Sequence, residues 1–167
     1  MSPRAAWRLE SLGFAEVYEY AAGLADWLAF GLPTEGHDAD QPRVGQIARR
    51  DAPVCALGDR IGDVRDRARA AGWDECLVLN DERVVLGRLR AAALAGDPEA
   101  IAADVMEPGP TTVRPDERLT TLWPRMRDTH VGRIIVTTPD GRLVGVAERE
   151  AIERERVEHE SGAGRRA

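Results

Sequence analysis

The sequence repeats itself at an offset of 58 residues without a gap, and this repeat limits the fold more than any other feature. Each copy is centred on two apolar runs that flank a polar turn, at residues 76–79 and 84–87 and again at residues 134–137 and 143–145. Identical residues at this offset are Arg60/Arg118, Arg67/Arg125, Arg69/Arg127, Val78/Val136, Gly87/Gly145 and Ala93/Ala151. Copies this short cannot each bury a good core. We therefore expect them to pack on one another and to leave a ligand cleft between them.

Each repeat is predicted to be a β-α-β-β-α unit, which makes the fold class α/β with small sheets. The elements expected in repeat one, residues 46–96, are a strand at 54–57, a helix at 60–71, the hairpin and a short helix at 91–95. Those expected in repeat two, residues 97–158, are a lead-in helix at 98–106, a strand at 111–113, a long helix that follows Asp116 and ends near Thr129, the hairpin and a helix at 148–159. Pro124 lies inside the predicted long helix, so we expect an imperfect helix there.

The first 36 residues form a separate segment in this interpretation. Ser2-Pro3 is typical of a helix start, and Gly13 of its end. A short strand at residues 17–20 and a second helix at residues 24–30 are predicted to follow. Gly, Pro and polar residues then predict a linker at 37–45. At the other end of the chain, residues 159–167 are predicted to be a disordered tail.

The charge pattern disfavours nucleic acid as a partner. The 167 residues carry a net charge of −6, and every basic residue is an arginine interleaved with Asp and Glu, as expected for salt-bridged helix faces. The sequence contains neither an apolar run that could span a bilayer nor a signal peptide. Cys55 and Cys76 lie in apolar runs and are expected to be buried thiols. We therefore expect a cytoplasmic protein that does not bind membranes.

Nothing in the sequence indicates an enzyme. His37, His130 and His159 are scattered, and no His, Cys or carboxylate spacing matches a metal site. The sequence has no Gly-rich phosphate loop after a strand and no acid–base pair suited to catalysis. We expect no catalytic residue, no metal and no enzymatic activity.

The second repeat resembles a CBS domain, a unit named after cystathionine β-synthase. The residues that carry this resemblance are Asp104-Val105-Met106, residues 111–116, Leu119, Ile134-Ile135-Val136, residues 140–146 and the helix from Arg149. The first repeat follows the same plan, so residues 46–158 resemble a tandem CBS pair, or Bateman module. Such pairs commonly form dimers. Many bind AMP, ADP, ATP or S-adenosylmethionine in the clefts between the repeats and regulate another activity.

The resemblance places a regulatory ligand in the cleft between the repeats, in contact with residues of both. The expected contacts are Arg90, Thr112, Arg114, Asp116 and Val146. Two departures weaken the expectation of an adenosine nucleotide. In nucleotide-binding members, the third position after the glycine of the last strand is Ser or Thr, and the sixth is Asp. Here the third position is Arg90 in repeat one and Glu148 in repeat two, and the sixth is Ala93 and Ala151. Arg90 could attract a phosphate, whereas Glu148 would repel one.

Residues 1–36 resemble the C-terminal end of a rhodanese (sulfurtransferase) domain. Residues 2–14 resemble the helix after its active-site loop, residues 17–18 the next strand and residues 23–33 the closing Gly-Trp-Leu-Pro segment. The loop with the catalytic cysteine would precede Met1, which could be an internal start in a longer reading frame. Three interpretations follow: a regulatory module with a protein partner at residues 1–36, a truncated rhodanese–CBS sulfurtransferase that lacks its catalytic cysteine loop, and a dimerisation scaffold without a ligand.

Overall fold

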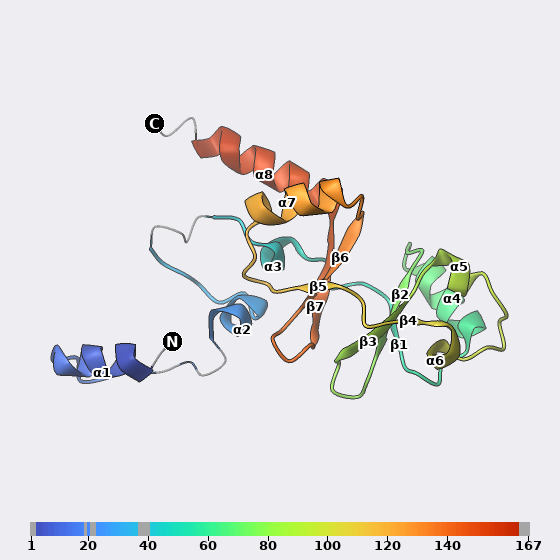
Figure 1. Cartoon of the computed structure of the whole chain (residues 1–167), viewed down its shortest axis with the longest axis horizontal. Helices are drawn as coiled ribbons and strands as arrows, with labels where there is room; N and C mark the ends of the chain where they lie inside the picture. Colours follow the sequence, from blue (N-terminus) through green and yellow to red (C-terminus); the bar gives the residue numbers. More distant parts are fainter. Residues whose placement is uncertain (1–2, 19, 21–22, 37–40, 164–167) are drawn as a thin grey trace.

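Two small β-sheets lie at the centre of the molecule, and helices cover their outer sides (Figure 1). The computed structural model describes residues 3–18, 20, 23–36 and 41–163. One sheet has the strand order β1-β2-β3-β4 and the other β5-β6-β7. Helices α4, α5 and α6 lie beside the first sheet, and α3, α7 and α8 beside the second (Figure 1). This arrangement confirms the predicted mixed α/β fold.

The two repeats have the same order of elements. Those of the first are β1 (Val54–Cys55), α4 (Ile61–Ala70), β2 (Cys76–Leu79), β3 (Val85–Leu89) and α5 (Ala91–Leu94). Those of the second are β5 (Thr112–Val113), α7 (Leu119–Asp128), β6 (Arg133–Thr137), β7 (Leu143–Glu148) and α8 (Arg149–Ala163). In both, the first strand pairs in parallel with the second, which pairs antiparallel with the third. The predicted β-α-β-β-α order is therefore confirmed.

Each repeat is completed by a short lead-in helix at the start of the other repeat. Helix α3 (Val44–Ile47) packs on repeat two, where the amide of Val44 donates to the carbonyl of Glu117 at 2.9 Å. Helix α6 (Ala102–Val105) packs on repeat one, where the amide of Ala102 donates to the carbonyl of Asp59, also at 2.9 Å. Val44 and Ala102 are both fully buried. The lead-in segments thus cross between the repeats, and α3 begins inside the predicted linker.

The hairpin tips of the two repeats are joined by a reciprocal pair of hydrogen bonds. The amide of Val85 donates to the carbonyl of Gly141 at 3.0 Å, and the amide of Leu143 donates to the carbonyl of Arg83 at 2.9 Å. Behind them lies an apolar cluster to which both repeats contribute. Its buried members are Trp73, Leu77, Leu79, Ile135 and Val146. The repeats therefore pack on one another through their sheets, as expected for units too short to bury separate cores.

The N-terminal segment follows the prediction only in its helices. Helix α1 (Pro3–Ser11) and helix α2 (Gly23–Ala29) are present, and the buried Ala29 joins the core of repeat two. The strand predicted at residues 17–20 is wrong: residues 17, 18 and 20 form no strand, and residue 19 lies outside the described residues. A short extended run needs a neighbouring strand to accept its backbone hydrogen bonds, and the sheet order offers none here. The rhodanese-like arrangement is not supported.

Two further differences concern the ends of repeat two. A strand that was not predicted, β4 (Glu107–Pro108), pairs with β3 and extends the first sheet across the join between the repeats. Helix α8 continues to Ala163, so residues 159–163, predicted to be disordered, are helical. Residues 164–167 of that predicted tail lie outside the described residues. Within the described part of the chain, each helix is too short or too polar to cross a membrane.

Candidate functional site

A cleft lined by arginine side chains lies where the two repeats meet, and we call it the open cleft. It consists of two adjoining hollows of about 540 Å³ and 410 Å³ that share Arg88, Arg90 and Arg133. The larger hollow is also lined by residues 107–111 and by the end of α7 with the start of β6. The smaller is lined by Asp74, Glu75 and the region where β7 meets α8. Each volume falls within the range typical of small-molecule sites.

The three shared arginines come from both sheets, at places that are not equivalent in the two repeats. Arg88 lies near the end of β3, Arg90 follows this strand directly, and Arg133 begins β6. Residues two apart in a strand point to the same side, which brings the side chains of Arg88 and Arg90 to one wall. The strand pairing fixes the neighbours of two of them: Arg88 lies opposite Leu77 in β2, and Arg133 lies opposite Glu148 in β7.

Each of these arginines has a carboxylate partner. Arg88 Nε lies 2.9 Å from Glu75 Oε2 in an ion pair, although the N–H is not directed at the oxygen. Glu75 is only 5% exposed, so its charge is poorly screened by water. Arg90 Nε donates to Glu107 Oε2 at 2.9 Å, with both side chains well exposed. The guanidinium of Arg90 can therefore exchange Glu107 for a ligand at little desolvation cost.

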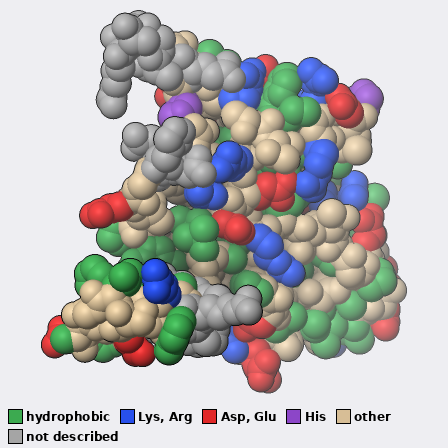
Figure 2. Space-filling view, turned by 60° about the vertical axis from the view of Figure 1, so that its left-hand side comes forward, with side chains coloured by type: hydrophobic (Ala, Val, Ile, Leu, Met, Phe, Trp, Pro, Cys, Tyr) green, Lys and Arg blue, Asp and Glu red, His purple; other side chains and the backbone are tan. Residues whose placement is uncertain are grey.

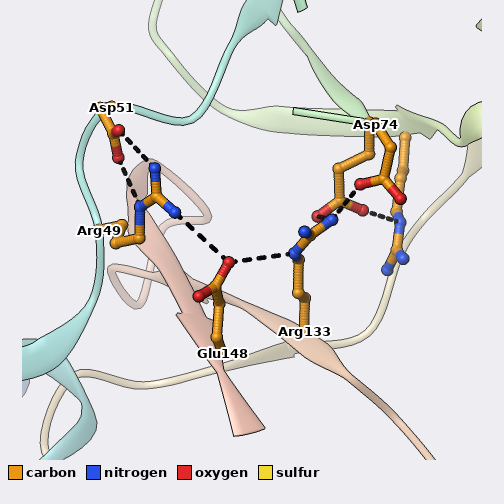
Figure 3. A network of polar contacts seen from close by, with 7 residues as sticks. Arg49, Asp51, Asp74, Arg133 and Glu148 are labelled. Carbon is orange, nitrogen blue, oxygen red and sulfur yellow. Dashed lines mark hydrogen bonds and ion pairs between the residues drawn. The ribbon is translucent and has the colours of Figure 1, made fainter. Parts of the chain in front are cut away.

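Arg133 lies at the centre of a larger network (Figure 3). Its Nε donates to Glu148 Oε1 at 3.3 Å, and its Nη1 contacts Asp74 and, at 3.7 Å, Glu75. Burial works to lower the pKa of Arg133, but Asp74, Glu75 and Glu148 together outweigh it and raise that pKa. The same hydrogen bond lowers the pKa of Asp74. Arg133 is therefore positively charged inside the cleft at any physiological pH.

The larger hollow also has apolar side chains in its lining. They include Met126, Val131, Ile134 and the prolines of the Pro108-Gly109-Pro110 turn. Arg125 lines the same hollow and donates to Glu117 at 2.6 Å. A cleft lined by guanidinium groups and apolar side chains suits a ligand that joins an anionic group to a flat apolar body.

The equivalent place on the other side of the pair is occupied by the chain itself, and we call it the filled cleft. At the offset of 58 residues, Val131 is replaced by Trp73, Gly109 by Asp51, Arg90 by Glu148 and Glu107 by Arg49. Trp73 is only 5% exposed, and the guanidinium of Arg49 lies 4.5 Å from the centre of its ring. Arg49 also donates to both oxygens of Asp51, at 3.0 and 2.7 Å, and these bonds lower the pKa of Asp51.

Of the predicted ligand contacts, Arg90 lines the open cleft, whereas the other four are not among its lining residues. Thr112 pairs with Ile135 in the second sheet, and its neighbour Thr111 reaches the cleft instead. Arg114 donates to the hydroxyl of Thr137 at 2.6 Å. The carbonyl of Asp116 accepts a hydrogen bond from Arg43, and Val146 is buried between the sheets.

Sequence reasoning missed Arg88, Arg125 and Arg133, which line the open cleft beside Arg90. One signal was available, because Arg88 and Arg90 alternate along a strand whose equivalent in repeat two reads Val146 and Glu148. Arg133 could not be found in this way. It reaches the cleft because β6 follows the turn after α7, and only the packing of the two repeats brings that turn opposite β3.

The metal-ligating side chains and the cysteines of the described residues form no metal cluster. No group of three or more His, Cys, Asp or Glu side chains in the described ranges could hold a metal ion. Cys55 and Cys76 are buried free thiols. A hydrogen bond with Cys55, together with burial, raises the pKa of Cys76 far above its usual range, so this thiol is not a nucleophile at neutral pH.

Residues 102–158 match the CBS domain family. The fold is similar to that of the cytosolic domain of the Mg²⁺ channel MgtE in complex with ATP, with a TM-score of 0.63 and 21% identity over 70% of this chain and 50% of that chain. It is also similar to CBSX2, a CBS-pair protein from Arabidopsis thaliana (TM-score 0.63, 18% identity, 72% of this chain and 98% of that chain). The structure of CBSX2 in complex with AMP gives a TM-score of 0.62 and 19% identity over 70% of this chain and 96% of that chain.

The CBS domains of a transcriptional regulator from Streptococcus pneumoniae are similar as well, with a TM-score of 0.62 and 20% identity over 68% of this chain and 98% of that chain. The chain spans about half the length of the two magnesium-transporter structures that it matches. No curated protein matches the sequence. These findings confirm the CBS domain in the second repeat and the fold of a CBS pair for the two repeats together.

Proposed function

We propose that this chain, whose two repeats have the fold of a CBS pair, is a regulatory module that senses a phosphorylated adenosine ligand in the open cleft. The observation that carries this proposal is the convergence of Arg88, Arg90 and Arg133 on one cleft that also has apolar side chains in its lining. The AMP complex of CBSX2 and the ATP complex of the MgtE domain support the choice of ligand class, since both have this fold. The proposed role is binding without catalysis.

In this proposal the arginines hold the phosphates, and the apolar side chains of the larger hollow hold the base. Guanidinium groups bind phosphate oxygens through paired N–H donors, and such charge-assisted bonds are stronger than neutral ones. Ala93 stands where a carboxylate would bind the ribose in nucleotide-binding CBS pairs. We therefore expect binding to depend on the number of phosphates more than on the sugar, in the order ATP, ADP, AMP. S-adenosylmethionine, a cation, would bind least.

Isothermal titration calorimetry with these four ligands tests the proposal. Arg90→Ala removes a guanidinium whose present partner, Glu107, is exposed, so the fold should tolerate the change. We expect its loss to weaken ATP binding about tenfold or more, as for a hydrogen bond to a charged group worth about 1.5–3 kcal/mol. Arg154→Ala is the matched control, because Arg154 is exposed on α8 and does not line the open cleft. Equal affinities for the two variants, or no heat with any of the four ligands, would reject the proposal.

A second candidate function is that of a dimerisation scaffold that needs no ligand. Apolar side chains lie exposed in the N-terminal segment, at the lower left of Figure 2. The large ones are Trp7, Leu12, Phe14, Tyr18, Tyr20, Leu24 and Phe30. Exposed apolar groups in this number favour contact with another chain, which we propose to be a second copy.

Light scattering over a range of concentrations tests this candidate. A dimer that dissociates in the double variant Trp7→Ser/Phe14→Ser would assign the contact to the N-terminal segment. A dimer that persists in this variant would instead favour contact through the CBS pair. A monomer at every concentration would reject the scaffold function.

A further inference from the structure

We propose that Arg133 links the two clefts, so that an anion bound in the open cleft loosens the side chains that occupy the filled cleft. Arg133 lines both hollows of the open cleft. It also supports Trp73 and Glu148, which belong to the filled cleft. This inference rests on the proposed function, because it needs an anionic ligand at Arg88, Arg90 and Arg133.

The link runs through a continuous chain of ion pairs (Figure 3). Asp51 binds Arg49, and Arg49 Nη1 lies 3.4 Å from Glu148 Oε1. That same oxygen accepts from Arg133 Nε at 3.3 Å. Arg133 continues to Asp74 and Glu75, and Glu75 meets Arg88 at 2.9 Å. One carboxylate oxygen of Glu148 is thus shared between an arginine of the filled cleft and an arginine of the open cleft.

Trp73 is held by the same two arginines. The guanidinium of Arg49 lies 4.5 Å from the centre of its ring, and that of Arg133 lies 5.2 Å from it. A cation over an indole ring is attracted by the electron density of its face. Any shift of Arg133 towards the open cleft therefore acts on Trp73 directly, as well as through Glu148 and Arg49.

The packing around Trp73 leaves polar groups without aligned partners. Trp73 Nε1 and Arg88 Nε are both buried and make no well-aligned hydrogen bond, although an interaction with Trp73 helps to lower the pKa of Asp51 and Arg88 forms an ion pair with Glu75. An unsatisfied buried donor destabilises the arrangement that contains it. A change in charge beside the filled cleft can therefore loosen the arginines that cover the indole.

A bound anion supplies such a change in two ways. Phosphate oxygens at Arg133 compete with Glu148 for its N–H donors. Their negative charge also repels Glu148, which lines the smaller hollow. Both effects separate Arg133 from Glu148 and draw its guanidinium towards the anion, away from the ring of Trp73 that it now contacts. Because Arg133 covers part of that ring, the indole becomes more accessible to water.

Trp73 fluorescence, taken as the difference between the full chain and Trp73→Phe, tests the inference. Sodium tripolyphosphate is the probe, since it carries the anionic groups without absorbing ultraviolet light, and calorimetry on the same samples reports whether it binds. We expect binding to shift the emission of Trp73 to longer wavelength and to increase its quenching by acrylamide. Glu148→Gln should show this raised quenching before any ligand is added. Glu150→Gln is the matched control, because it removes the same charge from the smaller hollow and makes no ion pair with Arg49 or Arg133 in the described structure.

The outcomes separate the two proposals. Heat of binding with unchanged Trp73 emission overturns the link and leaves the open cleft as a ligand site. Equal quenching in Glu148→Gln and Glu150→Gln also overturns it. If neither tripolyphosphate nor ATP gives heat, the proposed function itself fails, and the link fails with it. Binding with a Trp73 response in Glu150→Gln, together with raised quenching in ligand-free Glu148→Gln, supports both.

Discussion

The open and filled clefts have the same backbone frame but opposite side chains. In both, a lead-in helix from the neighbouring repeat is fixed by an amide-to-carbonyl hydrogen bond of 2.9 Å. Arg90 pairs with Glu107 at the open cleft, whereas the equivalent pair at the filled cleft is Glu148 with Arg49, so the signs of the charges are exchanged. Trp73 then occupies the place that Val131 leaves free. The comparison teaches that the repeat determines where clefts form, while a few side chains determine which one can take a ligand.

The largest effect in this comparison should come from emptying the filled cleft. Trp73→Ala removes a buried indole from the contact between the sheets, and we expect a loss of about 3–5 kcal/mol in the free energy of unfolding. Urea denaturation measures this loss. Val131→Ala is the control at the equivalent position, and it should cost about 1 kcal/mol or less because Val131 is only partly buried. Similar losses for both variants would mean that Trp73 does not fill its cleft.

The paired glycines offer a second way to separate the clefts. A Cβ atom at Gly145 would lie 2.5 Å from the carbonyl oxygen of Arg49, a backbone atom that takes part in the bridge to Val146. A Cβ atom at Gly87 would meet Sδ and Cγ of Met106, which a change of rotamer can move, and would lie 3.1 Å from the Cβ of Met106. We expect Gly145→Ala to cost about 1–3 kcal/mol and Gly87→Ala distinctly less, by urea denaturation. The reverse order would show that the Arg49 backbone is not fixed as described.

The sequence allowed the common frame to be predicted, but not the difference between the clefts. The offset of 58 residues, the hairpin turns and the CBS-like segments of repeat two were sufficient to place the β-α-β-β-α units. Arg90 was placed at the cleft because it follows a recognisable strand. The role of Trp73 could not be predicted, since a tryptophan after a helix is equally suited to a core or a surface contact. The strand predicted at 17–20 failed because an extended apolar run forms a strand only where a partner exists.

A tryptophan introduced into the open cleft should fill it and weaken nucleotide binding there. Val131→Trp places an indole in the open cleft, near Arg133, at the position equivalent to Trp73 in the filled cleft. This indole should exclude the base of a nucleotide. We expect the affinity for ATP to fall at least about tenfold, or about 1.4 kcal/mol, by calorimetry. Thermal unfolding of the variant checks that the fold is retained. Unchanged affinity in a folded Val131→Trp chain would place the ligand elsewhere.

The smallest effect concerns the acid dependence of the network around Arg133. The hydrogen bond from Arg133 lowers the pKa of Asp74 below its ordinary value of 3.8, so the charged carboxylate stabilises the folded state. This contribution is complete above pH 3.8 and is lost as the pH falls through the lower pKa of the folded state. Because the Asp74 side chain is 67% exposed, we expect Asp74→Asn to cost only about 0.5 kcal/mol at pH 7.

Urea denaturation of the wild type and Asp74→Asn, from pH 7 down to about pH 3, measures this dependence. The difference between the two proteins should shrink as the pH falls, because protonation of Asp74 removes the same charge as the substitution. Asp81→Asn is the control, since this exposed carboxylate makes no ion pair in the described structure. A difference that persists unchanged at low pH would assign the effect of Asp74 to packing. The anion-driven release of Arg133 would then have to act through Glu148 alone.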